Sequence, residues 1–162
     1  MKDDNFSDLP GWDDNLKDHD DEGEEWKPNP TRDACKAMYK RWSTIMTMLN
    51  GCLRDNIIKG EESDFIVEHQ SMILGDAYQV GAKTRSSEAG GIYVIRMENA
   101  SIIRKNAQLV QSSILVFMEE GIIDKEYGKV IRNDIDVFKD LFKKWVSTFE
   151  KDEFTDEWGL FI

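Results

Sequence analysis

The chain has 162 residues, of which 40% are hydrophobic and 33% charged, enough apolar residues for the core of one domain. It lacks the run of about 18–20 apolar residues that a membrane helix needs, and its acidic first ten residues lack the apolar segment of a secretory signal. We therefore predict a cytoplasmic protein with no membrane partner.

The net charge of −11 is concentrated at the two ends of the chain. Residues 1–33 contain twelve acidic and four basic residues, and residues 147–162 contain five and one. Residues 34–146 are almost neutral, with fifteen acidic and sixteen basic residues. Broad binding to nucleic acid needs a positive field, so this pattern disfavours a nucleic-acid partner but leaves room for a small basic site.

Residues 1–28 are predicted to form a mobile acidic tail, because the stretch DDNLKDHDDEGEE has almost no apolar periodicity. Trp12 and Trp26 lie among the acids. Two alternatives remain: these tryptophans fold back onto the domain, or the tail is a disordered docking segment.

The first two helices are predicted from their start signals and apolar stripes. Asn29 can cap a helix that begins at Pro30, and Ser63 can cap the second one. Apolar residues at alternating spacings of three and four give each helix one buried face. These stripes are Cys35, Met38, Trp42, Ile45, Leu49 and Cys52 in the first helix, and Phe65, Ile66, His69, Met72, Ile73, Ala77 and Val80 in the second.

The third and fourth helices are predicted over about residues 88–120 and 125–149. Ser86 or Ser87 can cap the third helix, Gly121 ends it, and Asp124 caps the fourth. The fourth helix carries the stripe Ile131, Ile135, Phe138, Phe142, Trp145 and Phe149.

Short connections make consecutive helices antiparallel neighbours. We therefore predict an all-α, up-down-up-down four-helix bundle over residues 29–150. The acidic tail, residues 1–28, precedes it. A short apolar segment, residues 151–162, follows it and packs on the bundle or on a partner.

A row of polar residues on the third helix is unusual. Asn99, Asn106 and Ser113 recur every seven residues beside an apolar row, which contains Ile95, Ile102, Leu109 and Val116. Buried asparagine on such a seam can fix helix register. We predict that the polar row lies at a helix contact and is a candidate subunit interface.

We identify no catalytic constellation, cofactor site or metal-ligand set in the sequence. A di-iron bundle needs two Glu-x-x-His motifs, whereas the only histidines are His19 and His69, and Ile66 stands three residues before His69. Cys35 and Cys52 would lie about 25 Å apart along one helix, too far for a disulfide, and are interpreted as core thiols.

The turn between the second and third helices is the best candidate for ligand binding. Lys83, Arg85, Ser86 and Ser87 would surround the start of the long third helix, where unpaired backbone amides and the helix dipole favour anions. The stretch GAKTR is not a phosphate-binding loop, because the Gly-Lys-Ser/Thr order is missing.

Residues 70–162 resemble an uncharacterised family of bacterial four-helix proteins, chiefly through AGGIYVIRMENA and DEWGLF. A more distant similarity is to the four-helix-bundle proteins encoded in ribosomal RNA intervening sequences, in which a small-residue turn joins the middle helices. The first resemblance implies the fold, and the second implies oligomeric, nucleic-acid-associated assemblies. The acidic ends of this chain depart from their basic character.

The leading functional hypothesis is a non-enzymatic interaction or assembly protein that binds a protein partner or itself. The alternative is nucleic-acid or small-anion binding at the turn between the second and third helices.

Overall fold

The computed structural model describes residues 9–14, 26–54, 64–88 and 90–162. These residues form four α-helices and one π-helical turn, and they contain no strand, so the predicted all-α class is confirmed. The elements are α1 (Pro30–Leu49), η2 (Asn50–Arg54), α3 (Asp64–Ser86), α4 (Tyr93–Glu119) and α5 (Lys125–Val146).

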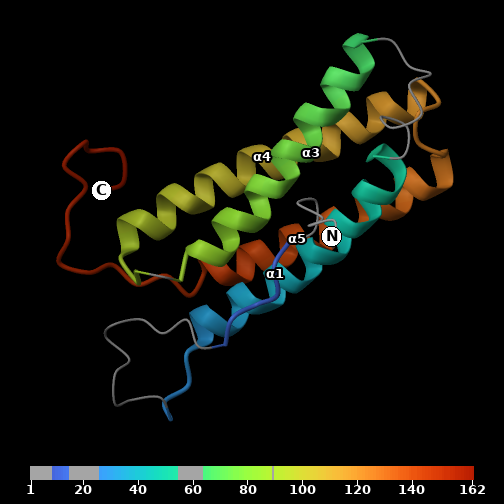
Figure 1. Ribbon diagram of the computed structural model, residues 1–162. Helices are drawn as coiled ribbons and strands as arrows, with labels where there is room; N and C mark the ends of the chain where they lie inside the picture. The colour runs from blue at the N-terminus through green and yellow to red at the C-terminus, as the bar shows by residue number, and fades with distance from the viewer. Residues whose placement is uncertain (1–8, 15–25, 55–63, 89) are drawn as a thin grey trace, which may run out of the picture.

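The four helices pack in the order in which they follow one another in the chain. The α3–α4 and α1–α5 contacts are the most extensive, and the α4–α5 contact is the sparsest. The bundle therefore consists of two layers, α3 with α4 and α1 with α5 (Figure 1). This arrangement agrees with the predicted up-down-up-down topology.

Three of the predicted helix boundaries are confirmed by their capping contacts. The Asn29 carboxamide oxygen accepts a hydrogen bond from the Arg32 amide at 3.0 Å. The Asp124 carboxylate accepts from the amides of Glu126 and Tyr127, both at 3.1 Å. Gly121, with φ of 72°, stands just beyond the end of α4, where a left-handed residue terminates a helix. The predicted cap Ser63 lies outside the described residues.

The predicted start of the long helix was wrong. Helix α3 continues to Ser86, and α4 does not begin until Tyr93. Gly91 separates them with φ of 61°, a conformation that residues with a side chain rarely adopt. Instead of Ser86 or Ser87, the carboxylate of Asp152 caps α4, because it accepts from the Tyr93 amide at 2.8 Å.

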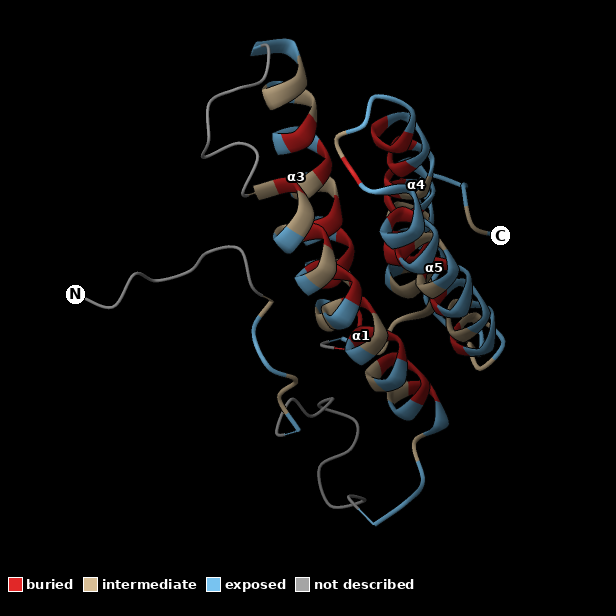
Figure 2. Ribbon diagram, turned by 90° about the vertical axis from the view of Figure 1, so that its right-hand side faces the viewer, coloured by how far each residue is buried: buried red, intermediate tan, exposed pale blue. Residues whose placement is uncertain are grey.

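The core lies on the facing sides of the four helices (Figure 2). The predicted stripes of α1 and α5 are confirmed: all their members are buried except Cys52, Phe142 and Phe149, which are half-buried. Trp42 and Trp145 are the largest fully buried side chains. The Trp42 indole donates to the Ala77 carbonyl oxygen at 2.7 Å, which ties α1 to α3.

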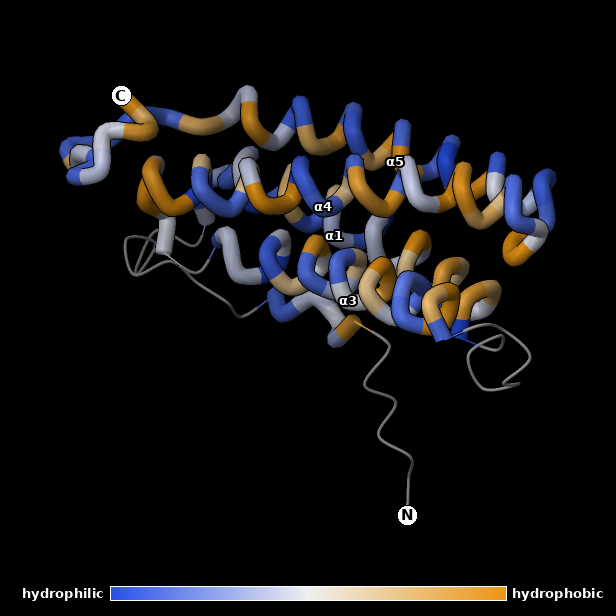
Figure 3. The backbone as a smooth tube through the Cα atoms, turned by 90° about the horizontal axis from the view of Figure 1, so that it is seen from above, coloured by the Kyte–Doolittle hydropathy of each residue, from blue (hydrophilic) through white to orange (hydrophobic). Residues whose placement is uncertain are grey.

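The predicted apolar rows of the second and third helices were only partly correct. On α4 the core side chains are Ile103, Val110 and Phe117, each one residue beyond the predicted row. One residue is a rotation of about 100° around a helix. Members of the predicted rows that are exposed instead are Phe65, Met72, Ile95, Leu109 and Val116. Apolar residues therefore lie on both the buried and the exposed sides of α4, and Figure 3 shows hydrophobic and hydrophilic residues following one another along this helix.

Candidate functional site: a groove between α4 and α5

The predicted anion site is not at a helix start. Lys83, Arg85 and Ser86 belong to the last turn of α3, and Ser87 follows it. The Ser86 and Ser87 hydroxyls both donate to the Lys83 carbonyl oxygen, at 3.3 and 2.6 Å. Carbonyl oxygens and the negative end of the helix dipole face this point. The geometry on which the anion-binding prediction rested is therefore absent.

The predicted polar row is buried, but within one chain. Asn99, Asn106 and Ser113 all face the interior. The Asn106 amide nitrogen donates to the Gln79 carboxamide oxygen on α3 at 2.8 Å. All three side chains are therefore buried within one chain, and Asn106 makes its contact at the α3–α4 interface.

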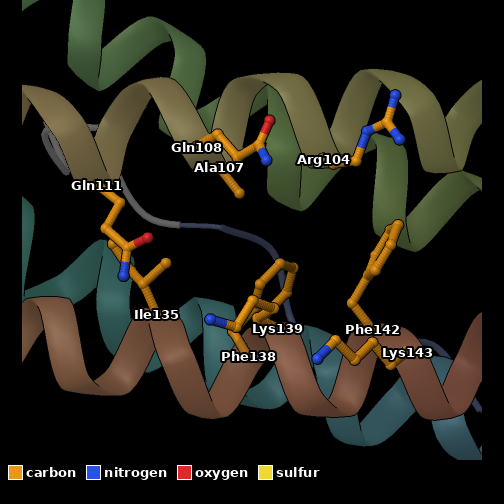
Figure 4. Close-up of a pocket in the computed structure, with 9 residues that line it drawn as sticks. All are labelled: Arg104, Ala107, Gln108, Gln111, Ile135, Phe138, Lys139, Phe142 and Lys143. Carbon is orange, nitrogen blue, oxygen red and sulfur yellow. The ribbon is translucent and has the colours of Figure 1, made fainter.

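A groove between α4 and α5 has a mainly apolar lining. Its volume is about 250 Å³, and Figure 4 shows Phe138 and Phe142 reaching from α5 toward α4. Ala107 lies opposite them, and its small side chain leaves the space open. The full lining is Arg104, Ala107, Gln108, Gln111, Ile135, Phe138, Lys139, Phe142 and Lys143.

Hydrogen bonds join α4 to α5 on one side of the groove. The Gln111 amide nitrogen donates to the Arg132 carbonyl oxygen at 3.1 Å and to the Asp136 carboxylate at 3.0 Å. Arg132 in turn donates to the Gln111 carbonyl oxygen at 2.9 Å. These three bonds fix the helix spacing beside Ala107, so the groove is built into the bundle.

A second polar cluster fixes the bundle at the end where α3 turns into α4. The buried Glu88 carboxylate accepts from the Trp145 indole at 3.2 Å and from Arg96 at 3.1 Å. Arg96 also donates to the Gly91 carbonyl oxygen at 2.9 Å. Glu88 thereby joins the α3–α4 connection to α5, and sequence reasoning missed this because nothing in the local sequence points Glu88 inward.

The rim of the groove is basic. Arg104, Lys139 and Lys143 line it, and none of the lining residues is acidic. Lys139 pairs with Asp136 at 3.1 Å, and Lys143 lies 4.0 Å from the Asp140 carboxylate, so each lysine also faces a carboxylate three residues earlier on α5. The hydrogen bond from Gln111, together with Lys139, lowers the pKa of Asp136 below its usual value. An apolar floor under a basic rim suits an acidic, amphipathic ligand.

The opposite seam, between α1 and α3, is covered by the chain itself. The N-terminal segment, residues 9–14, lies there, so of the two alternatives for Trp12 the structure shows the one in which it folds back onto the bundle. Trp12 packs on Tyr39 with ring centroids 5.6 Å apart, and the Tyr39 hydroxyl donates to the Pro10 carbonyl oxygen. Leu9 lies directly against Gly81, where a Cβ would come within 2.3 Å of it. Trp26 is exposed. Residues 1–8 and 15–25, which include His19, lie outside the described part of the chain.

Basic residues secure the acidic end of that segment. Arg32 donates to the carbonyl oxygens of Asp13 and Asp14, at 3.3 and 2.7 Å. Lys36 pairs with the Asp14 carboxylate at 2.5 Å, and this hydrogen bond lowers the pKa of Asp14. An acidic, tryptophan-containing segment is thus held over one seam of the bundle.

The C-terminal segment, residues 151–162, is ordered but largely exposed. The Asp156 carboxylate accepts from the amides of Trp158, Leu160 and Phe161, at 3.0, 2.8 and 3.0 Å. These bonds form a turn, in which Trp158 is 95% exposed. Of the two predicted contacts, packing on its own bundle is slight, because only Asp156 and Phe161 are half-buried.

The two thiols are poorly suited to chemistry. Burial raises the pKa of Cys35 well above its usual value, and its Sγ donates to the Thr84 carbonyl oxygen at 3.1 Å. Burial also raises the pKa of Cys52 to about 11. In the described part of the chain, no three His, Cys, Asp or Glu side chains gather as a metal site would require.

None of the described helices is both long and apolar enough to cross a bilayer. Comparison with known proteins gives no match to a family model, to a curated protein or to a solved structure. The candidate site therefore rests on its own geometry and chemistry.

Proposed function

We propose that this protein is a non-enzymatic interaction protein whose α4–α5 groove binds an acidic, amphipathic peptide segment. The main support for this proposal is the groove itself. Its apolar floor lies beneath the basic side chains of Arg104, Lys139 and Lys143, and consists of Ala107, Ile135, Phe138 and Phe142. Aromatic and aliphatic anchors fit such a floor, while carboxylates beside them pair with the rim.

Two features support peptide binding. The Gln111 and Arg132 contacts fix the groove before any ligand arrives, which reduces the entropy lost on binding. The covered α1–α3 seam shows that this bundle holds an acidic segment with a tryptophan at a similar place between its layers. The proposal places the protein in the cytoplasm, since reduced thiols such as Cys35 are typical of a reducing compartment.

The test is an NMR titration of the whole chain with short synthetic peptides. One peptide alternates Trp and Leu with Asp and Glu, and its control replaces every acid by lysine. We expect the acidic peptide to shift the signals of Ala107, Gln108 and Phe142, and the lysine peptide to leave them unchanged. Equal shifts with both peptides, or none with either, would refute the proposal.

A space-filling variant sharpens this test. Ala107→Leu extends a side chain from this buried position of α4 into the groove, so it should abolish peptide binding, and an unchanged helical circular dichroism spectrum checks that the fold is kept. Ala37→Leu makes the same change at an exposed position of α1 and should bind as the unaltered protein does.

A further inference from the structure

The C-terminal segment has the chemistry that the groove selects. Residues 151–162 contain four acidic residues and one basic residue. Phe154, which lies between the acids, and Trp158, Leu160 and Ile162, which follow them, are exposed. Apolar groups so exposed contribute nothing to the fold of their own chain, so their burial is available to an association.

The N-terminal segment provides a precedent within the same molecule. In LPGWDD the tryptophan stands beside glycine and two acids, and DEWGLF has the same components in reverse order. The first sequence lies on the α1–α3 seam, with Trp12 on Tyr39 and Asp14 on Lys36. The α4–α5 seam offers Phe142 and Lys143 for the same kind of contact, and it is open.

The C-terminal segment does not cover the groove of its own chain. Asp152 attaches its base to the first turn of α4 through the Tyr93 amide. From there the segment projects beyond the end of the bundle, as Figure 1 shows at the chain terminus marked C. The turn held by Asp156 fixes the backbone at Trp158, and the Trp158 side chain is exposed.

We propose that the α4–α5 groove receives the C-terminal segment of a second copy of this chain, with Trp158 as the anchor. This inference rests on the proposed function and names its ligand. The indole packs between Ala107 and Phe142, and the acids beside it face Lys139 and Lys143. A mutual exchange, in which each copy inserts its segment into the other, gives a closed two-fold dimer without unpaired grooves.

Matched tryptophan variants of the whole chain test whether Trp158 is the anchor. We expect sedimentation equilibrium to give a dimer for the unaltered protein. Trp158→Ala should weaken the dimer by about tenfold or more, as removal of a buried tryptophan anchor does. Trp26→Ala removes another exposed tryptophan and should leave the dimer unchanged. Equal dimerisation by all three proteins would overturn the inference.

Matched alanine variants test the groove, and mixing tests the exchange. Ala107→Leu should be monomeric, and Ala37→Leu dimeric. A mixture of Trp158→Ala and Ala107→Leu combines one intact groove with one intact segment, so it should form heterodimers more readily than either variant forms homodimers. A mixture that stays monomeric while the unaltered protein dimerises would show that the two residues do not meet.

Two further outcomes separate this inference from the proposed function. If the unaltered chain is monomeric at millimolar concentration but still binds the acidic synthetic peptide, the second copy is the wrong occupant and the groove function stands. If the chain is monomeric and no acidic peptide binds, both proposals are wrong.

Discussion

Replacing Glu88 by glutamine should destabilise the bundle by about 3 kcal/mol, the low end of the range for removing one partner of a buried ion pair. The Glu88 side chain is 5% exposed, and that of its partner Arg96 is 14% exposed, with 3.1 Å between the paired atoms. Glutamine keeps an oxygen for the Trp145 indole but leaves the Arg96 cation without its counter-charge. The loss is therefore electrostatic.

Urea unfolding followed by tryptophan fluorescence measures this loss, because Trp42 and Trp145 are fully buried. For a domain of this size, about 3 kcal/mol corresponds to a fall in Tm of roughly 6–12 °C. Glu98→Gln, at an exposed site on α4, should change stability by less than about 0.5 kcal/mol. An equally small effect of Glu88→Gln would refute the assigned role of the ion pair. In a double-mutant cycle, Arg96→Met should lower the free energy of unfolding by about 2 kcal/mol less in the Glu88→Gln protein than in the unaltered protein.

Three other perturbations follow from described contacts. Gly81→Ala should displace Leu9 and shift the NMR signal of the Trp12 indole, while the stability of the bundle stays the same or rises by up to about 1 kcal/mol; an unmoved indole signal would contradict this. The backbone hydrogen bond from Phe161, followed by the one from Trp158, lowers the pKa of Asp156. The turn is therefore fully stabilised above the ordinary aspartate pKa and loosens as pH falls through the lowered one. Amide signals of the turn that stay constant down to pH ~2 would count against it. The raised pKa of Cys52, about 11, leaves roughly a hundredfold less thiolate than an ordinary cysteine has. Alkylation of Cys52 in the folded protein at neutral pH should therefore be slow, and alkylation as fast as in the urea-unfolded protein would contradict this.

The sequence predicted the helices well where their signals are local. Asn29 and Asp124 cap helices because their side chains reach amides two or three residues away, so the pattern is visible in the chain itself. The stripe of α5 was equally clear, since most of the residues between its members are polar. Existence, order and antiparallel packing of the helices followed from these signals.

The sequence failed where the choice depends on partners in space. Pairs such as Leu109 and Val110 are both apolar, so periodicity alone could not decide which one faces the core. The start of α4 was placed too early because its cap, Asp152, lies 59 residues away from the amide that it caps. That same error placed the anion site at a helix start.

The groove was also beyond sequence reasoning. It exists because the small Ala107 side chain of α4 faces Phe138 and Phe142 of α5, and the hydrogen bond from Gln111 to Asp136 fixes the spacing of these helices beside it. The only available signal was a small residue on α4 beside basic ones, and such a pattern occurs in many solvated helices. Only the spatial pairing of α4 with α5 gives it meaning.

The packing of each helix on its sequence neighbours has a consequence for how the chain folds. Most contacts join residues close in sequence, and contact order of this kind favours folding in microseconds to milliseconds. The exception is the closure of α5 onto α1, in which Arg41 meets Asp134, 93 residues away. We expect the α3–α4 hairpin to form early and the α1–α5 contact to close last, so α1–α5 mutations should chiefly accelerate unfolding and leave the folding rate almost unchanged.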